Sequence, residues 1–186
     1  MSEVYKIGIT INNNKPINEV SSINVLANKG IVGDRHFKQF NDPYNQLTLI
    51  ESENIDYYNI KHGLNIPYID FRRNIITKGI KLNDLVGKKI LVGKVELEGI
   101  DLCRPCKHLC EVLGQENIIK EFLRRGGIRC QILTSSSIKI KEWEEKFDRD
   151  QKEKERLEFL KDEKFKKKEL EKLRKLEELE NNSKKI

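Results

Sequence analysis

The densest group of reactive side chains in this sequence is a set of three cysteines within eight residues, Cys103, Cys106 and Cys110. The basic residues Arg104 and Lys107 stand among them. Positive charge beside a thiol favours the thiolate, which is the form that attacks sulfur, accepts sulfur or binds a soft metal. The stretch therefore predicts sulfur chemistry, metal ligation or both.

The spacing of Cys103 and Cys106 leaves several kinds of centre open. Two intervening residues suit a zinc knuckle, but a closed zinc site needs four ligands, and the further candidates are His108, Cys110 and Cys130. The spacing matches no common iron–sulfur run, and the βαβ setting of a thioredoxin-like dithiol is missing. For Cys110 and Cys130 the sequence favours buried packing over ligation. Cys103 and Cys106 are left as reactive thiols, a redox dithiol or part of a zinc site.

Composition and charge narrow the setting. The sequence has no run of eighteen apolar residues and no basic start followed by an apolar stretch, so we expect a cytoplasmic protein that does not enter a membrane. Cysteines clustered in one region do not form the spaced framework of a small secreted protein. Most of the net charge of +6 lies in residues 1–140, which hold 20 basic and 15 acidic residues. This surplus favours an anionic small ligand over a nucleic acid.

The elements that must position these side chains are mainly short strands separated by turn residues. Alternating or β-branched segments predict strands at residues 4–11, 20–27, 46–50, 74–77, 89–92, 94–97 and 129–134. Helices are expected at residues 51–61 and 116–125, each ended by glycine. The sequence has no internal repeat, Walker loop or dinucleotide-binding fingerprint. We therefore expect a mainly β, barrel-like α+β fold rather than repeating βαβ units.

The sequence changes character after residue 138. Residues 139–186 contain neither glycine nor proline, and glutamate, lysine, arginine and leucine dominate them. Opposite charges three or four residues apart predict a long charged helix. Lysines interrupt its heptads, which favours a solvated helix over a specific coiled-coil dimer. We therefore divide the chain into a globular domain of residues 1–138 and a helical tail of residues 139–186.

Several short segments resemble, in order and spacing, successive motifs of the MOSC domain family, which is named for the C-terminal part of molybdenum cofactor sulfurase. The segments are GIVGDRH (30–36), QLTLIE (46–51), FRRNI (71–75), KKILVGKVEL (88–97), LCRPC (102–106) and RGGIR (125–129). The resemblance covers residues 5–138 and is to the small, stand-alone bacterial form of the family. It implies a β-barrel-like domain that binds molybdenum cofactor or handles sulfur destined for a metal–sulfur centre.

The resemblance also implies roles for individual residues. Cys106, in the Pro-Cys position, would be the cysteine that accepts sulfur or ligates molybdenum, and Cys103 would be a second sulfur or resolving thiol. Molybdenum cofactor is a phosphate-bearing pterin dithiolene (molybdopterin with its metal), so its site also needs cations and hydrogen-bond donors. The residues expected to supply them are Arg35, His36, Arg72, Arg73, Asn74 and Arg104.

The most specific of these expectations concern the FRRN segment (71–74) and the turn at residues 33–36. Arg72 and Arg73 are expected to clamp a phosphate, and the amide of Asn74 to read the pterin edge. Adjacent side chains of a strand point to opposite faces, so we expect only one of the two arginines to reach the pocket. Asp34 is expected to bond turn amides, and Arg35 to reach the pocket.

Two functions from different classes are carried forward. In the first, the protein is a sulfur transferase, a sulfur carrier or part of a molybdenum-dependent reductase system, and Cys106 is its reactive group. Neither a second redox domain nor a lysine motif for pyridoxal phosphate is recognisable. The partner would therefore be a pyridoxal phosphate-dependent cysteine desulfurase, a molybdoenzyme or a cofactor-biosynthesis protein. In the second, the cysteines hold zinc in a non-catalytic interaction module whose charged tail recruits a protein.

Overall fold

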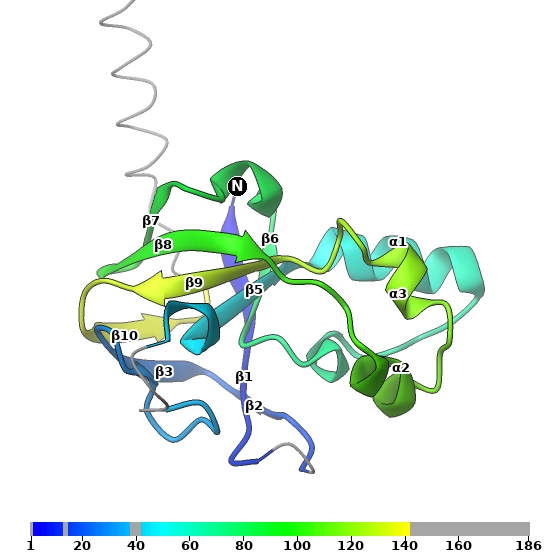
Figure 1. Ribbon diagram of the computed structural model, residues 1–186, viewed down its shortest axis with the longest axis horizontal. Helices are drawn as coiled ribbons and strands as arrows, with labels where there is room; N and C mark the ends of the chain where they lie inside the picture. Colours follow the sequence, from blue (N-terminus) through cyan, green and yellow to red (C-terminus); the bar gives the residue numbers. More distant parts are fainter. Residues whose placement is uncertain (1, 13–14, 38–41, 142–186) are drawn as a thin grey trace, which may run out of the picture. The chain divides into compact units, whose positions relative to one another are not determined.

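Ten strands and six short helical segments make up the part of the protein that the structure describes, which is residues 2–12, 15–37 and 42–141 of a computed structural model (Figure 1). The larger sheet contains, in spatial order, β2 (Asn18–Val20), β1 (Glu3–Ile9), β6 (Ile75–Lys78), β5 (Leu47–Glu51), β9 (Ile128–Ile132), β8 (Val95–Leu102) and β7 (Lys89–Val92). The smaller sheet contains, in order, β10 (Ser136–Lys139), β3 (Ser22–Leu26) and β4 (Gly30–Ile31). The fold is thus mainly β with a few short helices, as expected.

The helices gather on one side of the larger sheet, at the right of Figure 1. They are α1 (Ser52–His62), α2 (Lys107–Leu113) and α3 (Ile118–Glu121). The chain also forms three 3₁₀ turns, η1 (Pro43–Asn45), η2 (Tyr68–Phe71) and η3 (Leu82–Leu85), of which η2 contacts α2. Within the described residues, the neighbouring strands of this sheet are antiparallel except β5 and β6. Those two strands run parallel, and α1 provides the crossover that such a pair requires.

A buried aromatic and aliphatic cluster fixes the helices against the sheet. The ring of Phe122 lies 5.0 Å from that of Phe71 and 5.3 Å from that of Tyr58, measured between centroids. Aromatic pairs at these distances add to the burial of apolar area. The cluster consists of Ile50, Ile55, Tyr58, Phe71, Ile76, Leu109, Ile118 and Phe122. It ties η2, α2 and α3 together, and these three elements carry or border the predicted site.

Four expectations about the elements differ from the structure, the first only in part. The strand expected at 20–27 is confirmed as β3 over Ser22–Leu26, but Ser21 separates it from β2, which ends at Val20. The helix expected at 116–125 is regular only over α3, because the chain then turns into the close contacts of Gly126. The segment after Cys106 forms α2, which was not among the expected helices, and Leu109 of α2 enters the buried cluster. The last strand is β10 rather than β9.

The chain beyond β10 is described only as far as Lys141. The backbone N–H groups of Ile140 and Lys141 donate to the carbonyls of Ser21 and Val4, at 3.1 and 2.7 Å. The charged helix expected after residue 138 lies, from residue 142 on, outside the described residues, and the division of the chain at residue 138 stays a prediction. In the ranges that the structure covers, no helix is long and apolar enough to cross a membrane.

Candidate functional site

Two arginines just before β6, Arg72 and Arg73, lie within electrostatic reach of Arg35 in the turn after β4. Burial is the main cause that lowers the pKa of Arg35; Asp34 opposes the shift, and the charges of Arg72 and Arg73 add to it. The expected alternation of Arg72 and Arg73 was wrong, because neither belongs to a strand. Arg72 ends η2 with a left-handed backbone (φ 59°), and Arg73 follows in the link to β6. The positive charges of Arg72 and Arg73 therefore both act on the guanidinium of Arg35.

Backbone carbonyls hold two of these guanidinium groups. Arg73 donates from Nε to the carbonyl of Gly126 at 3.0 Å and from Nη1 to that of Phe71 at 3.4 Å. Arg72 donates from Nη1 to the carbonyl of Lys15 at 3.2 Å. A carbonyl orients a guanidinium without cancelling its charge, so these bonds position positive charge that an anion can use.

Asp34 and His36 shape the turn that carries Arg35. The Asp34 carboxylate accepts from the backbone N–H of Thr10 at 3.2 Å and of His36 at 3.1 Å, which confirms its expected role in bonding turn amides. The Nε of Arg35 donates to Nε2 of His36 at 3.0 Å. His36 thus accepts a hydrogen bond within the arginine cluster, and in that bond its Nε2 is unprotonated.

The side chain of Asn74 supports the candidate site through hydrogen bonds within the protein rather than being open to a ligand. Its Oδ1 accepts from both the backbone N–H and the hydroxyl of Thr48, at 3.1 and 2.9 Å. Its Nδ2 donates to the carbonyl of Gly8 at 3.4 Å and to Asp34 at 3.5 Å. The amide that was expected to read a pterin edge is therefore engaged within the protein. Asn74 joins β1, β5 and the Asp34 turn and so positions the arginines.

The cysteine loop leaves the end of β8 and exposes one thiol. Of the four cysteines, all within the described residues and all free thiols, only Cys106 is classed as exposed. Cys103 and Cys130 are buried, and burial raises the pKa of Cys130, which keeps its thiol protonated. Cys110 is partly buried beside the helical cluster, in agreement with the expected packing role. The structure therefore separates Cys106 from the other three by access to solvent.

The metal alternatives can be compared with this arrangement. The exposed residues Arg104, Lys107 and His108 surround Cys106 in sequence. Nowhere in residues 2–12, 15–37 and 42–141 do three or more His, Cys, Asp or Glu side chains stand where they could hold a metal ion. The closed zinc site that the Cys-x-x-Cys spacing left open therefore has no ligand set in this part of the chain.

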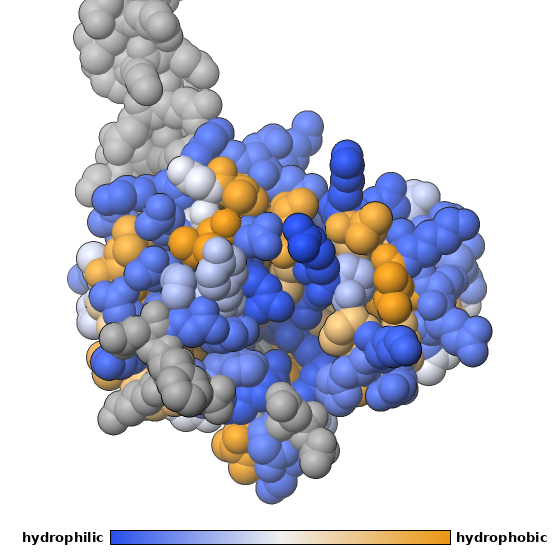
Figure 2. All heavy atoms as spheres, in the orientation of Figure 1, coloured by the Kyte–Doolittle hydropathy of each residue, from blue (hydrophilic) through white to orange (hydrophobic). Residues whose placement is uncertain are grey.

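Gly126 joins the cysteine loop to the arginine cluster. Its carbonyl accepts from Arg73, and its Cα lies so close to the carbonyl of Cys103 that an added Cβ would be 2.0 Å from that oxygen. The N–H of Cys103 donates to the carbonyl of Gly127 at 2.7 Å. Figure 2 shows a recess rimmed largely by hydrophilic residues between the sheet and the helices. An exposed thiol and a set of arginines thus belong to one connected part of the fold.

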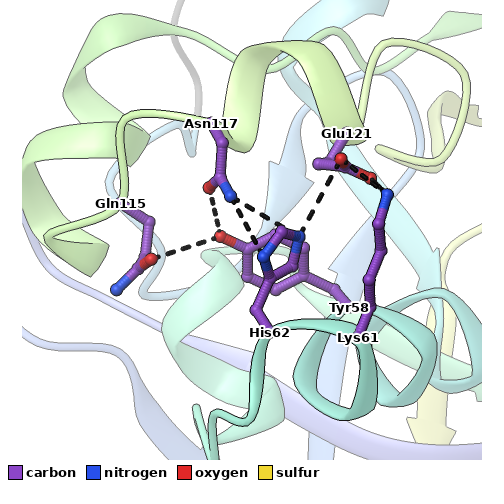
Figure 3. Close-up of polar contacts among 6 residues, drawn as sticks. All are labelled: Tyr58, Lys61, His62, Gln115, Asn117 and Glu121. Atoms are coloured by element: carbon purple, nitrogen blue, oxygen red, sulfur yellow. Dashed lines mark hydrogen bonds and ion pairs between the residues drawn. The ribbon is translucent and has the colours of Figure 1, made fainter.

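A cluster of polar side chains holds α1 and the segment around α3 together (Figure 3). The hydroxyl of Tyr58 donates to Oδ1 of Asn117 at 2.5 Å, and Nδ2 of Asn117 lies 3.3 Å from Nδ1 of His62. Lys61 pairs with Glu121 at 2.8 Å. The sequence alone indicated neither of these contacts of Asn117.

Comparison with known proteins identifies the family of this chain. A family model described as the MOSC domain matches residues 33–156. The chain belongs to the MOSC domain family. The expected resemblance is confirmed, and with it the association of the fold with molybdenum cofactor binding or sulfur-related chemistry. A search of curated proteins finds no match.

Solved structures share the MOSC fold with this chain. The YuaD protein from Bacillus subtilis is 19% identical with a TM-score of 0.64, and the match covers 76% of this chain and 93% of that one. YiiM from Geobacillus stearothermophilus is 14% identical with a TM-score of 0.58, covering 77% and 76%. YiiM from Escherichia coli is 16% identical with a TM-score of 0.58, covering 77% and 70%. At these identities the likeness establishes the fold.

Sequence reasoning missed two residues that organise the candidate site. Thr48 stands in the QLTLIE segment, but its type and position on a strand suggested no more than a strand residue. Gly126 stands in the RGGIR segment, where its glycine identity was the available signal of close packing. Both act on the site through backbone groups or through a neighbour, which a search for reactive side chains does not detect.

Proposed function

We propose that this MOSC domain is a sulfur carrier for molybdenum cofactor, with Cys106 as the sulfur acceptor and the arginine cluster as the binding site for the cofactor's phosphate. The observation that carries the proposal is the exposure of Cys106 in a loop that Gly126 connects to Arg73. A thiol alone would serve many reactions. Its combination with clustered guanidinium groups favours an anionic guest with a sulfur-binding centre.

The residues present suit molybdenum cofactor by their chemistry. Arg35, Arg72 and Arg73 supply positive charge, and a guanidinium can bind phosphate by two parallel hydrogen bonds. Cys106 supplies a soft sulfur, the ligand type that molybdenum and sulfane sulfur both accept. When bound, the cofactor supplies a molybdenum centre that takes sulfur or a thiolate as a ligand. A reductase-like role, with Cys106 as that ligand, would use the same residues.

This chain's part in sulfur transfer is a thiolate–persulfide exchange at the sulfur atom of Cys106. The Cys106 thiolate attacks the terminal sulfur of a donor persulfide, the S–S bond of the donor breaks, and the donor leaves as a thiolate. Cys106 then carries a persulfide, and no net oxidation occurs. Arg104 and Lys107, both exposed in the same loop, add positive charge for an approaching anionic donor. Cys103 is buried, and its role as a resolving thiol stays a prediction.

Cys106→Ser tests the proposed function, with Cys110→Ser as the matched control. After treatment with glutathione persulfide, mass spectrometry is expected to find one added sulfur on the wild type and on Cys110→Ser but none on Cys106→Ser. The retention of molybdenum cofactor, followed by pterin fluorescence and molybdenum analysis, is expected to fall in Arg73→Ala. Equal sulfur loading of Cys106→Ser and the wild type would refute the assignment of Cys106.

A further inference from the structure

The short helix α3 and the turn after it present two apolar side chains to solvent. Ile118 and Phe122 lie four residues apart and are almost completely buried, and the N–H of Phe122 donates to the carbonyl of Ile118 at 2.9 Å. Ile119 and Leu123 follow each of them by one position, and 40% and 57% of their surfaces are exposed. Residues four apart share a face of a helical turn, so this outward pair is distinct from the pair in the core.

Two positively charged side chains lie beside this apolar pair. Lys120 and Arg124, again four residues apart, are exposed, and neither forms an ion pair with another residue that the structure describes. The acidic neighbour in sequence, Glu121, is already paired with Lys61 at 2.8 Å. The positive charge on this face is therefore not neutralised by the acidic residue that adjoins it.

This face adjoins the proposed sulfur site. α3 contacts α2, which begins at the residue after Cys106, and Val112 on α2 is a further apolar side chain with 45% of its surface exposed. The chain leaves α3 through Gly126, which packs on the carbonyl of Cys103. Figure 2 shows hydrophobic residues gathered over α3, beside the hydrophilic recess. A protein seated on this face would thus lie next to the loop that exposes the thiol.

We propose that the α3 surface, defined as Ile119, Lys120, Leu123 and Arg124, is the docking site of the protein that donates sulfur to Cys106. The inference rests on the proposed function. The chemistry of the surface requires a partner face with apolar side chains and a rim of carboxylates, because buried apolar contact supplies affinity and opposite charges supply orientation and speed. The donor is a cysteine desulfurase with such a face. Its persulfide passes the terminal sulfur to the Cys106 thiolate, and the donor cysteine leaves as a thiolate.

The test compares two sulfur donors acting on the full chain. One donor is the cysteine desulfurase of the same organism supplied with L-cysteine, and the other is glutathione persulfide, which needs no docking surface. Leu123→Glu is expected to lower the rate of transfer from the desulfurase about tenfold and to leave the rate from glutathione persulfide unchanged. Reversal of charge at both Lys120 and Arg124 is expected to lower the desulfurase rate and to flatten its dependence on ionic strength.

The control is Ile60→Glu, because Ile60 is an apolar residue of α1 with 82% of its surface exposed and lies outside the α3 surface. It is expected to change neither rate. The docking proposal is overturned if Leu123→Glu receives sulfur from the desulfurase as fast as the wild type does. It is also overturned if the wild type takes sulfur from the desulfurase no faster than from glutathione persulfide at equal concentration, or if light scattering shows that Leu123→Glu abolishes only self-association. Failure of both donors to load wild-type Cys106 would instead refute the sulfur-carrier function.

Discussion

Gly126→Ala tests whether the arginine cluster and the cysteine loop form one site. The added Cβ would stand 2.0 Å from the carbonyl oxygen of Cys103, whereas ordinary contact begins at 3.4 Å, so the two segments must separate by about 1.4 Å. Gly126 has no positive φ, and the effect is therefore one of space rather than of backbone conformation. Overpacking of this kind costs about 1–3 kcal/mol in the free energy of unfolding.

The same displacement moves the carbonyl that holds Arg73, so the loss should extend to the site. Loss of one hydrogen bond between a positioned guanidinium and an anion costs about 1.5–3 kcal/mol, so we expect the affinity for molybdenum cofactor to fall at least about tenfold. Urea unfolding measures the first effect, and cofactor titration followed by pterin fluorescence measures the second.

Gly99→Ala is the matched control for this substitution. A Cβ at Gly99 would lie 2.3 Å from the carbonyl oxygen of Leu85, a comparable clash whose crowded atoms belong to Leu85 and Val86 rather than to the arginines or the cysteine loop. It is expected to lower stability by a similar amount while leaving cofactor affinity unchanged. If Gly126→Ala keeps both its stability and its affinity, or if Gly99→Ala loses affinity to the same extent, the connection through Gly126 is refuted.

Three further changes have expected results. Tyr58→Phe removes the hydrogen bond to Asn117 and should lower the free energy of unfolding by about 1 kcal/mol in urea; no change would contradict the role given to the α1–α3 cluster. Thr48→Val removes the hydroxyl that Asn74 uses and should cost about 1–2 kcal/mol, with weaker cofactor binding as the second readout. Burial raises the pKa of Glu51 above 4.5, so its contribution to stability is full at low pH and is lost as pH rises through the folded-state pKa. Glu51→Gln should therefore gain stability relative to the wild type as pH rises, and a pH-independent difference between the two would refute this.

Much of the framework follows from local patterns in the sequence. The alternation of residues 89–97 around Gly93 predicted the hairpin of β7 and β8, and Gly63 ends α1 with a left-handed backbone as its position indicated. The parallel pairing of β5 with β6 does not follow from such patterns, because it depends on contacts between distant segments. Likewise, α2 is short and begins among cysteines and a proline, so its stability comes from the burial of Leu109 rather than from helix propensity.

The sequence predicted which residue types make up the candidate site, but not the role of each residue in it. Cys103 and Cys106 have the same side chain and similar neighbours in sequence. In the fold, Cys103 is buried where its backbone bonds to Gly127 and packs on Gly126, whereas Cys106 is exposed. The backbone of Arg72 is left-handed, which a non-glycine residue seldom adopts and no propensity rule would assign. Asn74 has the same hydrogen-bonding groups whether it binds a pterin or Thr48, and only the fold decides between them.

The placement of β1 has a consequence for synthesis of the protein. This strand is synthesised before β6, with which it pairs, and the carbonyl of Val4 accepts from the backbone N–H of Lys141, which follows later still. Until residue 78 has been made, β1 has only the short β2 beside it. Pairings of such long sequence separation slow folding and leave an unpaired strand edge in the nascent chain. The segment around β1 is therefore expected to need protection from aggregation until β6 has been translated.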